Sequence, residues 1–76
     1  MLWNADEFAH HLRVLRIDRR LSREELAAKA GLNKSTIDSW EAGRNCPQLD
    51  KALEVADVLG VTLNELVGTN VGEKVA

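Results

Sequence analysis

The sequence predicts an all-α fold built as one small domain. Hydrophobic residues make up 45% of the 76 residues but aromatic residues only 4%, so Leu, Val, Ile and Ala must supply most of the core. Apolar residues recur at helical spacings of three and four along several segments, and no segment alternates as a strand does. Three segments also open with the residue pair of a helix capping box. A chain of this length can form a single modest core.

The first helix is expected to begin after Asn4 and to run to about Arg19. Asn4 and Glu7 have the spacing of a capping box, and Trp3 and Phe8 occupy the two positions of a hydrophobic staple. Basic residues end the segment, where they suit the negative end of the helix dipole. One face of this helix is expected to carry Ala5, Phe8, Leu12 and Leu15.

Two short helices follow, separated by a tight turn. Ser22 and Glu25 form a second capping box, and Gly31 has the position of a left-handed residue just after a helix end. Asn33 is a preferred N-cap for the next helix, which Gly43 ends. The inward-facing residues of the two helices are expected to be Leu26, Ala27, Ala30, Ile37 and Trp40.

A fourth and a fifth helix complete the predicted domain. Pro47 is compatible with the start of the fourth helix, and Gly60 ends it. Thr62 and Glu65 form a third capping box, which opens the fifth helix. The inward faces are expected to comprise Leu49, Ala52, Leu53, Ala56 and Leu59 in the fourth helix, and Leu63, Leu66 and Val67 in the fifth.

The domain is expected to span residues 1–67, with residues 68–76 as a flexible tail because they show no apolar periodicity. The formal net charge is -2, which is unfavourable for binding nucleic acid, but the charge is unevenly distributed. Residues 11–51 hold nine Lys or Arg against six Asp or Glu. The middle of the chain is therefore the part suited to a polyanionic partner.

Other classes of protein fit the sequence poorly. No run approaches the ~18 apolar residues of a membrane span, and the first residues lack the features of a secretory signal, so we expect a cytoplasmic protein. Cys46 is the single cysteine, and with His10 and His11 it forms no metal-ligand spacing, so no metal site is expected. Because no nucleophile and base recur at helical spacing, we expect no enzyme activity, no cofactor and no small-molecule ligand.

Two short helices joined by a tight turn at Gly31 have the geometry of a helix-turn-helix, although many helical bundles contain such pairs. The residues themselves are more specific. Over residues 12–66 the sequence resembles the Cro and cI type of helix-turn-helix, the Xre family. The resemblance implies a compact five-helix, lambda-repressor-like DNA-binding domain with the second and third helices as the helix-turn-helix. The motifs that carry it are LRVLR (12–16), LSREELA (21–27), STIDSWEAG (35–43), Pro47 and LGVTLNEL (59–66).

The resemblance also implies roles for particular residues in binding double-stranded DNA. Family members have a partly buried salt bridge at the positions of Arg16 and Glu41, which we expect to be structural. Arg20 departs from the pattern, because a glycine is common there. Asn33 has an alternative reading as the cap of the third helix. The implied base-reading residues are Lys34, Ser35 and Ser39, and the implied phosphate-binding residues are Arg23, Asn33, Arg44 and Asn45.

The sequence therefore favours a sequence-specific DNA-binding transcriptional regulator, a repressor that inserts its third helix (about residues 34–42) into the major groove of a pseudo-palindromic operator. Because one such helix contacts few bases, we expect a homodimer formed through the region of the fifth helix. The alternative is an antitoxin or phage regulatory protein that acts mainly on a protein partner, for which the negative net charge would be a reason. The valines expected to supply the dimer surface are Val55, Val58, Val61, Val67, Val71 and Val75.

Overall fold

A computed structural model of the chain describes residues 4–67 and, within them, contains five α-helices and no strand, which confirms the predicted all-α fold. Trp3 of the expected staple and the expected tail at 68–76 lie outside the described residues. None of the described helices is both long enough and apolar enough to cross a membrane. The helices are α1 (Ala5–Asp18), α2 (Arg23–Ala30), α3 (Lys34–Glu41), α4 (Leu49–Leu59) and α5 (Leu63–Val67).

α1 begins where its sequence predicts, but its cap differs from a capping box in one bond. The Oδ1 atom of Asn4 accepts from the backbone N–H of Glu7 at 2.7 Å. The Glu7 carboxylate accepts in return from the side-chain amide of Asn4 at 2.9 Å, whereas a capping box uses the backbone N–H. The difference follows from chemistry, because Asn has a side-chain N–H₂ group that Ser and Thr lack.

α2 and α5 open with complete capping boxes, as predicted. The backbone N–H of Glu25 donates to Ser22 Oγ at 2.9 Å, and the N–H of Ser22 donates to the Glu25 carboxylate at 2.8 Å. Thr62 and Glu65 exchange the same two bonds at 3.1 Å and 2.9 Å. Because a backbone amide donates to each charged carboxylate, the pKa of Glu25 and that of Glu65 are lowered.

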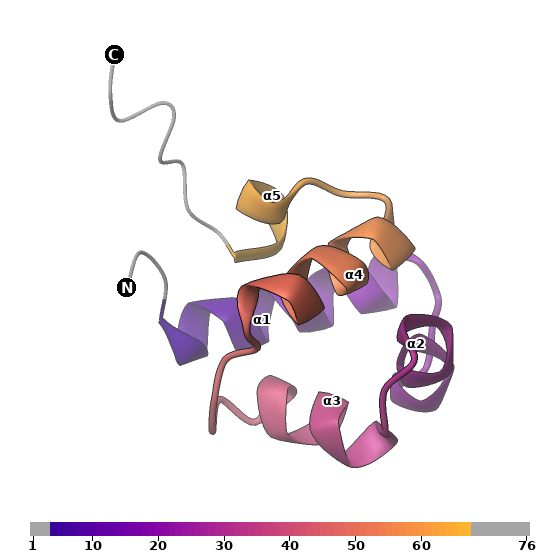
Figure 1. The fold of residues 1–76 in the computed structure, drawn as a ribbon, viewed down its shortest axis with the longest axis horizontal. Helices are drawn as coiled ribbons and strands as arrows, with labels where there is room; N and C mark the ends of the chain where they lie inside the picture. The colour runs from indigo at the N-terminus through magenta and orange to yellow at the C-terminus, as the bar shows by residue number, and fades with distance from the viewer. Residues whose placement is uncertain (1–3, 68–76) are drawn as a thin grey trace.

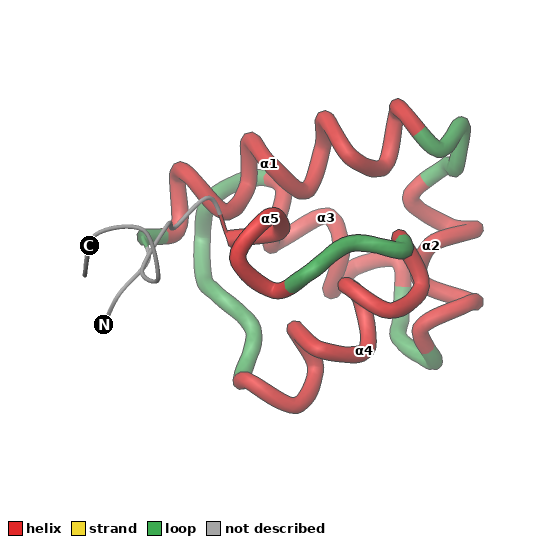
Figure 2. The backbone as a smooth tube through the Cα atoms, turned by 90° about the horizontal axis from the view of Figure 1, so that it is seen from above, coloured by secondary structure: helices red, strands yellow, loops and turns green. Residues whose placement is uncertain are grey.

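α1 and α4 form the middle of the molecule, with α5 on one side and α3 on the other (Figure 1). α5 packs against both α1 and α4, and the view from above shows it between them (Figure 2). α3 packs against α1 and α2, and α2 also contacts α4. α3 and α5 are thus on opposite sides, so the outward face of α3 is clear of the C-terminal helix.

The core lies where these helices meet. Phe8 of α1 and Trp40 of α3 pack edge to face, with ring centroids 6.0 Å apart and 73° between the ring planes. Trp40 is 5% exposed, which confirms it as a core residue. The largest fully buried side chains are Phe8, Leu12, Leu26, Ile37, Leu59, Leu66 and Val55.

The predicted inward face of α4 is wrong at two positions. Leu49 and Leu53 are 58% and 50% exposed, whereas Val55 is fully buried. A face that contains Leu49 and Leu53 and a face that contains Val55 both have helical spacing. The packing of α2 and α5 against α4 buries the face that contains Val55. The buried residues of α4 are Ala52, Val55, Ala56 and Leu59.

In the described part of the chain, the valines expected on a dimer surface are buried or partly buried. Val55 and Val67 are buried in the core, and Val58 and Val61 are partly buried against it. Their burial follows from the docking of α5 on α1 and α4, which the sequence pattern alone did not fix. Val71 and Val75 lie outside the described residues.

Candidate nucleic-acid interface

A tight turn at residues 31–33 joins α2 to α3. Gly31 has a φ of 71°, in the left-handed region that glycine adopts without steric cost, and this confirms its predicted role at the end of α2. The N–H of Leu32 donates to the carbonyl of Ala27 at 2.8 Å and closes the helix end. Ala27 and Ala30 are small and buried, so α2 and α3 can approach closely. The two helices have the arrangement of a helix-turn-helix.

α3 has one buried face and one outward face. Lys34 and Ser35, at its start, are exposed, and Ser39, one turn later, is half-buried. The three residues implied as base readers therefore all lie off the buried face, and Lys34 and Ser35 are the most accessible. The buried face carries Ile37, Trp40 and Glu41, each 5% exposed or less.

A bidentate ion pair between Arg16 and Glu41 joins α1 to the buried face of α3. Arg16 Nε donates to one oxygen of Glu41 at 2.6 Å, and Arg16 Nη2 donates to the other at 3.0 Å. The remaining Nη1 donates to the carbonyl of Leu21 at 2.8 Å. The hydrogen bonds to Glu41 raise the pKa of Arg16 further above its usual range. The pair orients α3 on α1, because the Glu41 side chain is only 3% exposed and Arg16 satisfies both its oxygens.

Arg13 is a cation near α3 that sequence reasoning missed. Its Nη2 donates to the backbone carbonyl of Glu41 at 3.1 Å, at the C-terminal end of α3. Its side chain is 55% exposed, so it can also meet a ligand. Arg13 lies three residues before Arg16, so both side chains lie on one face of α1. This spacing could have predicted that Arg13 also lies near α3.

Asp38 is a carboxylate that lies among the cations of the outward surface of α3. Its Oδ2 atom is 2.9 Å from Lys34 Nζ, and its Oδ1 atom is 3.5 Å from Arg23 Nε. The hydrogen bond from Lys34 contributes most to lowering the pKa of Asp38, and the charges of Arg23 and Arg44 contribute as well. The four-residue spacing from Lys34 was a visible signal, but the contact with Arg23 depends on how α2 packs on α3.

The implied phosphate ligands lie at the two ends of α3 and at the start of α2. Arg23 is the first residue of α2, and its side chain is 48% exposed. Asn33 has the extended backbone of an N-cap, but its side chain makes no capping hydrogen bond. Asn33 is therefore the N-cap residue of α3, as predicted, but its side chain does not form the capping hydrogen bond. Arg44 and Asn45 are exposed in the loop after α3.

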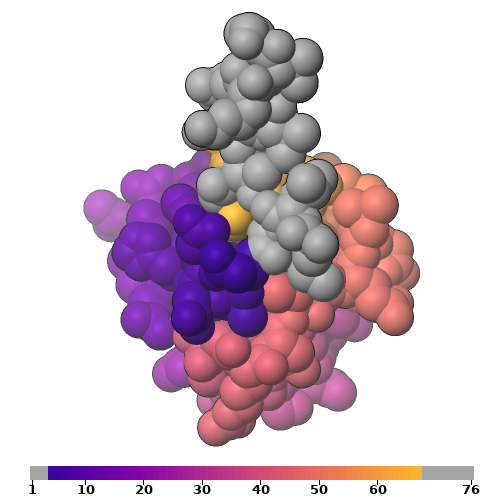
Figure 3. Space-filling model, turned by 90° about the vertical axis from the view of Figure 1, so that its left-hand side faces the viewer, coloured from indigo at the N-terminus to yellow at the C-terminus, as the bar shows by residue number. Residues whose placement is uncertain are grey.

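The loop after α3 is held close to α1 and α3. The N–H of Arg44 donates to the carbonyl of Ser39 at 3.1 Å. A Cβ atom at Gly43 would lie 2.9 Å from Asp6 Oδ1, so the loop passes directly beside the start of α1. Figure 3 shows the start of α1 and the segment around residues 40–48 in contact on one side of the molecule. The backbone that carries Arg44 and Asn45 is thus anchored against two helices.

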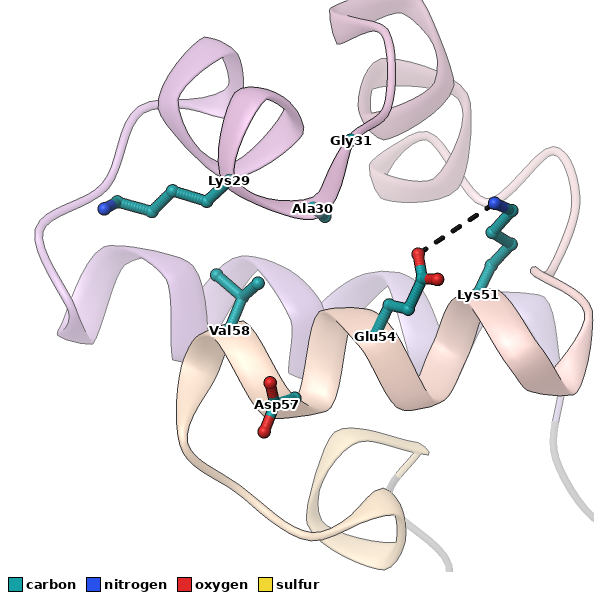
Figure 4. Close-up of a pocket in the computed structure, with 7 residues that line it drawn as sticks. All are labelled: Lys29, Ala30, Gly31, Lys51, Glu54, Asp57 and Val58. Atoms are coloured by element: carbon teal, nitrogen blue, oxygen red, sulfur yellow. Dashed lines mark ion pairs between the residues drawn. The ribbon is translucent and has the colours of Figure 1, made fainter.

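A groove of about 470 Å³ lies between the end of α2 and α4 (Figure 4). Its rim has charges of both signs, and Lys51 Nζ is 3.9 Å from the Glu54 carboxylate. None of the residues implied as DNA ligands lines it. We therefore place the candidate site on α3 and not in this groove. The lining residues are Lys29, Ala30, Gly31, Lys51, Glu54, Asp57 and Val58.

The helix-turn-helix family HTH_3 has a model that matches residues 12–66 of this chain. The chain belongs to this family. The matched range contains all of α2, α3 and α4, so the helix-turn-helix and its anchored loop lie wholly within it. The resemblance to Cro and cI regulators seen in the sequence is thereby confirmed.

Among curated proteins, this HTH_3 chain is similar to the cryptic phage CTXphi transcriptional repressor RstR of Vibrio cholerae. The two are 37% identical over 70 residues, which covers 88% of this chain and 63% of RstR. The chain thus spans slightly less than two thirds of the length of that repressor.

Two solved structures show where else this fold occurs. The restriction-modification controller protein C.AhdI from Aeromonas hydrophila is 34% identical with a TM-score of 0.78, and the match covers 82% of this chain and 94% of that one. Hydroxypropylphosphonic acid epoxidase from S. wedmorenis is 25% identical with a TM-score of 0.80, over 88% of this chain but 36% of the enzyme. The HTH_3 fold is found both as most of a controller protein and as a part of an enzyme, so the function must be argued from the surface residues.

Proposed function

We propose that this protein is a sequence-specific DNA-binding transcriptional regulator that places α3 in the major groove. The outward face of α3 carries the proposal, because exposed Lys34 and Ser35 are flanked by Arg23 on α2 and Arg44 beyond α3. Cations around a protruding helix attract phosphates, and a lysine with nearby hydroxyls supplies donors to base edges. The local balance of charge on this surface matters more than the net charge of -2 of the whole chain.

The residues divide into two roles in this proposal. Contacts to phosphates fix the register of the protein on the duplex, and contacts to base edges select the sequence. Asn33 suits a phosphate, because its side-chain N–H₂ group can donate to phosphate oxygens and the side chain is not held by a capping hydrogen bond. We assign base contacts to Lys34, Ser35 and Ser39, and phosphate contacts to Arg23, Asn33, Arg44 and Asn45.

We further propose that the protein is a repressor of a pseudo-palindromic operator. The match to RstR, which is named a transcriptional repressor and aligns with 88% of this chain, supports a role as a repressor. α3 is eight residues long and can reach few base pairs, so useful affinity needs two half-sites about one helical turn apart. A homodimer acting on DNA in the cytoplasm fits this requirement.

The exposed leucines of α4 supply apolar surface for such a homodimer. Leu49 and Leu53 are four residues apart, so they lie one turn above the other on the same side of α4. α4 packs against α5, and α3 lies on the opposite side of the molecule from α5 (Figure 1). We propose that the side of α4 and α5 forms the interface, which leaves α3 of each subunit free for the groove.

Selection from a randomised duplex pool, followed by sequencing at two salt concentrations, tests the proposed function. The wild type is expected to enrich a two-fold symmetric motif, and Lys34→Ala to lose the preference at one position in each half-site. Lys29→Ala is the matched control, because Lys29 carries the same charge but lines the groove beside α4. If the wild type enriches no motif at either salt concentration, the proposed function is wrong.

The second candidate function is an antitoxin or phage regulatory protein that acts mainly on a protein partner. Two observations favour it: the net charge is -2, and Asp38 pairs with two of the cations beside α3. A partner with basic surface would suit such a protein. A plot of log affinity for DNA against log salt distinguishes the two, since a slope near zero indicates no phosphate contacts.

We also propose that the chain has no enzyme activity of its own. Residues 4–67 contain no group of three or more His, Cys, Asp or Glu side chains placed to hold a metal ion. The similarity to the epoxidase spans 36% of that enzyme, so it concerns a part of the enzyme and not its whole chain. The proposed DNA contacts and the Arg16–Glu41 pair give a role to the polar side chains around α3 without any catalytic step.

A further inference from the structure

We propose that Asp38 determines DNA specificity by reading, together with Lys34, a single G·C base pair. Lys34 donates to guanine, and the Asp38 carboxylate accepts from the 4-amino group of the paired cytosine. This inference rests on the proposed function, since it requires α3 to lie in the major groove. It adds a residue that the family resemblance did not mark, and it names the base pair that the residue recognises.

Asp38 lies beside Lys34 on the outward surface of α3, and its two carboxylate oxygens have different surroundings. Lys34 and Asp38 are four residues apart on α3, so their side chains lie on the same side of the helix. The Asp38 side chain is 35% exposed, yet its Oδ1 atom is inaccessible to solvent and has no hydrogen-bond partner. Oδ1 faces Arg23, so we assign the DNA contact to Oδ2, the oxygen that pairs with Lys34.

Stability alone does not explain a carboxylate at this place. An exposed ion pair such as Lys34–Asp38 contributes little to folding, and lysine before aspartate is the less favourable order along a helix. A negative charge next to phosphates opposes binding unless a donor compensates it. In the major groove the donors are amino groups of bases, and an acidic side chain typically accepts from cytosine N4.

The spacing of the two charged groups matches one base pair. Lys34 Nζ and Asp38 Oδ2 are 2.9 Å apart, so a donor and an acceptor are presented side by side. A G·C pair presents guanine O6 and cytosine N4 side by side in the same way, because these two atoms are hydrogen-bonded to each other in the pair. Lys34 Nζ has three N–H donors, and after one is used by Asp38 two remain for guanine O6 and N7.

An A·T pair is a poorer partner for the same two side chains. Thymine O4 also lies beside the adenine amino group, but it is a single acceptor with a methyl group next to it. Lysine would then find one acceptor in place of two. We therefore expect a preference for G·C at one position of each half-site, with guanine on the strand that Lys34 contacts.

The test compares Asp38→Asn with Asp57→Asn on the operator that the wild type selects. Asp57 is an exposed residue of α4, so the control makes the same change in net charge away from α3 (Figure 4). The measured quantity is the ratio of the Kd for an operator with this pair changed to A·T to the Kd for the selected operator. We expect Asp38→Asn to lower this ratio about tenfold and Asp57→Asn to leave it unchanged.

Lys34→Ala and the double variant locate the contact on one base pair. Lys34→Ala is expected to weaken the preference for G·C at the same operator position as Asp38→Asn does. The double variant is expected to weaken this preference no more than the more severe of the two single variants. Asp38→Ala serves as a second replacement of Asp38. Thermal unfolding of every variant checks that each protein is folded. If the Asp38 variants keep the wild-type ratio, or relax a different position from Lys34→Ala, the inference is overturned. Absence of any wild-type motif would instead refute the proposed function itself.

Discussion

Arg20 departs from the family pattern, and its backbone conformation makes this departure unfavourable. Its φ is 58°, in the left-handed region that a side chain with a Cβ atom disfavours by about 1–2 kcal/mol. We predict that Arg20→Gly raises the free energy of unfolding by about 1 kcal/mol, after the greater backbone entropy of glycine in the unfolded chain is included. Urea denaturation measures this change. Lys29→Gly, inside α2, is the control and should destabilise by about 1 kcal/mol; an unchanged or lower stability of Arg20→Gly would contradict the prediction.

The Arg16–Glu41 pair holds a buried negative charge that needs its partner. Removing the arginine leaves a carboxylate whose side chain is 3% exposed, with Arg13 as a weaker partner at 3.8 Å. We predict that Arg16→Ala destabilises the protein by about 3 kcal/mol, because an unpaired buried charge is costly. The double variant Arg16→Met with Glu41→Leu should recover much of this loss in the same denaturation experiment. Equal instability of the single and double variants would show that packing, and not charge, explains the effect.

The side-chain contacts of α3 differ in how well they could be predicted from the sequence. The Arg16–Glu41 pair joins residues far apart in the chain, and the family resemblance was needed to indicate it. The Lys34–Asp38 contact follows from helical spacing and could have been inferred directly. The approach of Arg23 to Asp38 could not, since it depends on the rotation of α2 against α3.

The capping boxes of α2 and α5 make the stability of the protein depend on pH. The pKa values of Glu25 and Glu65 are lowered in the folded protein from an ordinary value of 4.5, chiefly by backbone hydrogen bonds. Their contribution to stability is therefore complete above pH 4.5 and is lost as the pH falls through the lowered folded-state pKa values. We predict that Glu25→Gln and Glu65→Gln unfold at lower temperature than the wild type at neutral pH, and that this difference shrinks in acid.

Thermal melting by circular dichroism from about pH 6 to about pH 3 measures this dependence. Glu24→Gln is a suitable control, because Glu24 is also in the first turn of α2 but makes no capping bond there. A wild type and capping variants that lose stability in parallel as the pH falls would rule out the capping carboxylates as a source of the acid sensitivity.

The elements show which features of the fold depend on local sequence. Helix starts and ends were predictable, because caps such as Ser22 and Gly31 act within a few residues of themselves. The inward face of α4 was not, since Leu49 and Val55 both fit the helical spacing and only contacts with other helices decide between them. Apolar residues at helical spacing thus predict that a helix is present more reliably than they predict which face of the helix is buried.

The arrangement of the whole molecule places α3 and α5 on opposite sides, which separates the proposed DNA surface from the proposed dimer surface (Figure 1). We predict that Leu53→Glu shifts the protein from dimer to monomer and weakens operator binding, because the charge would face a second copy of the chain. Ile17→Glu is the control, as Ile17 is exposed to a similar degree on α1. Sedimentation of both variants and the wild type at high micromolar concentration measures the change. A wild type that is monomeric under these conditions, free and on operator DNA, would exclude the homodimer.

The placement of α3 in the major groove, with Lys34 on a guanine, can be tested directly on the selected operator. Replacing one guanine at a time with 7-deazaguanine removes its N7 acceptor, which lies in the major groove. The wild type is expected to lose affinity at one guanine in each half-site, and Lys34→Ala to show no further loss at that same guanine. A wild type that tolerates every replacement, or a Lys34→Ala variant that loses affinity just as the wild type does, would contradict the placement of α3 in the groove.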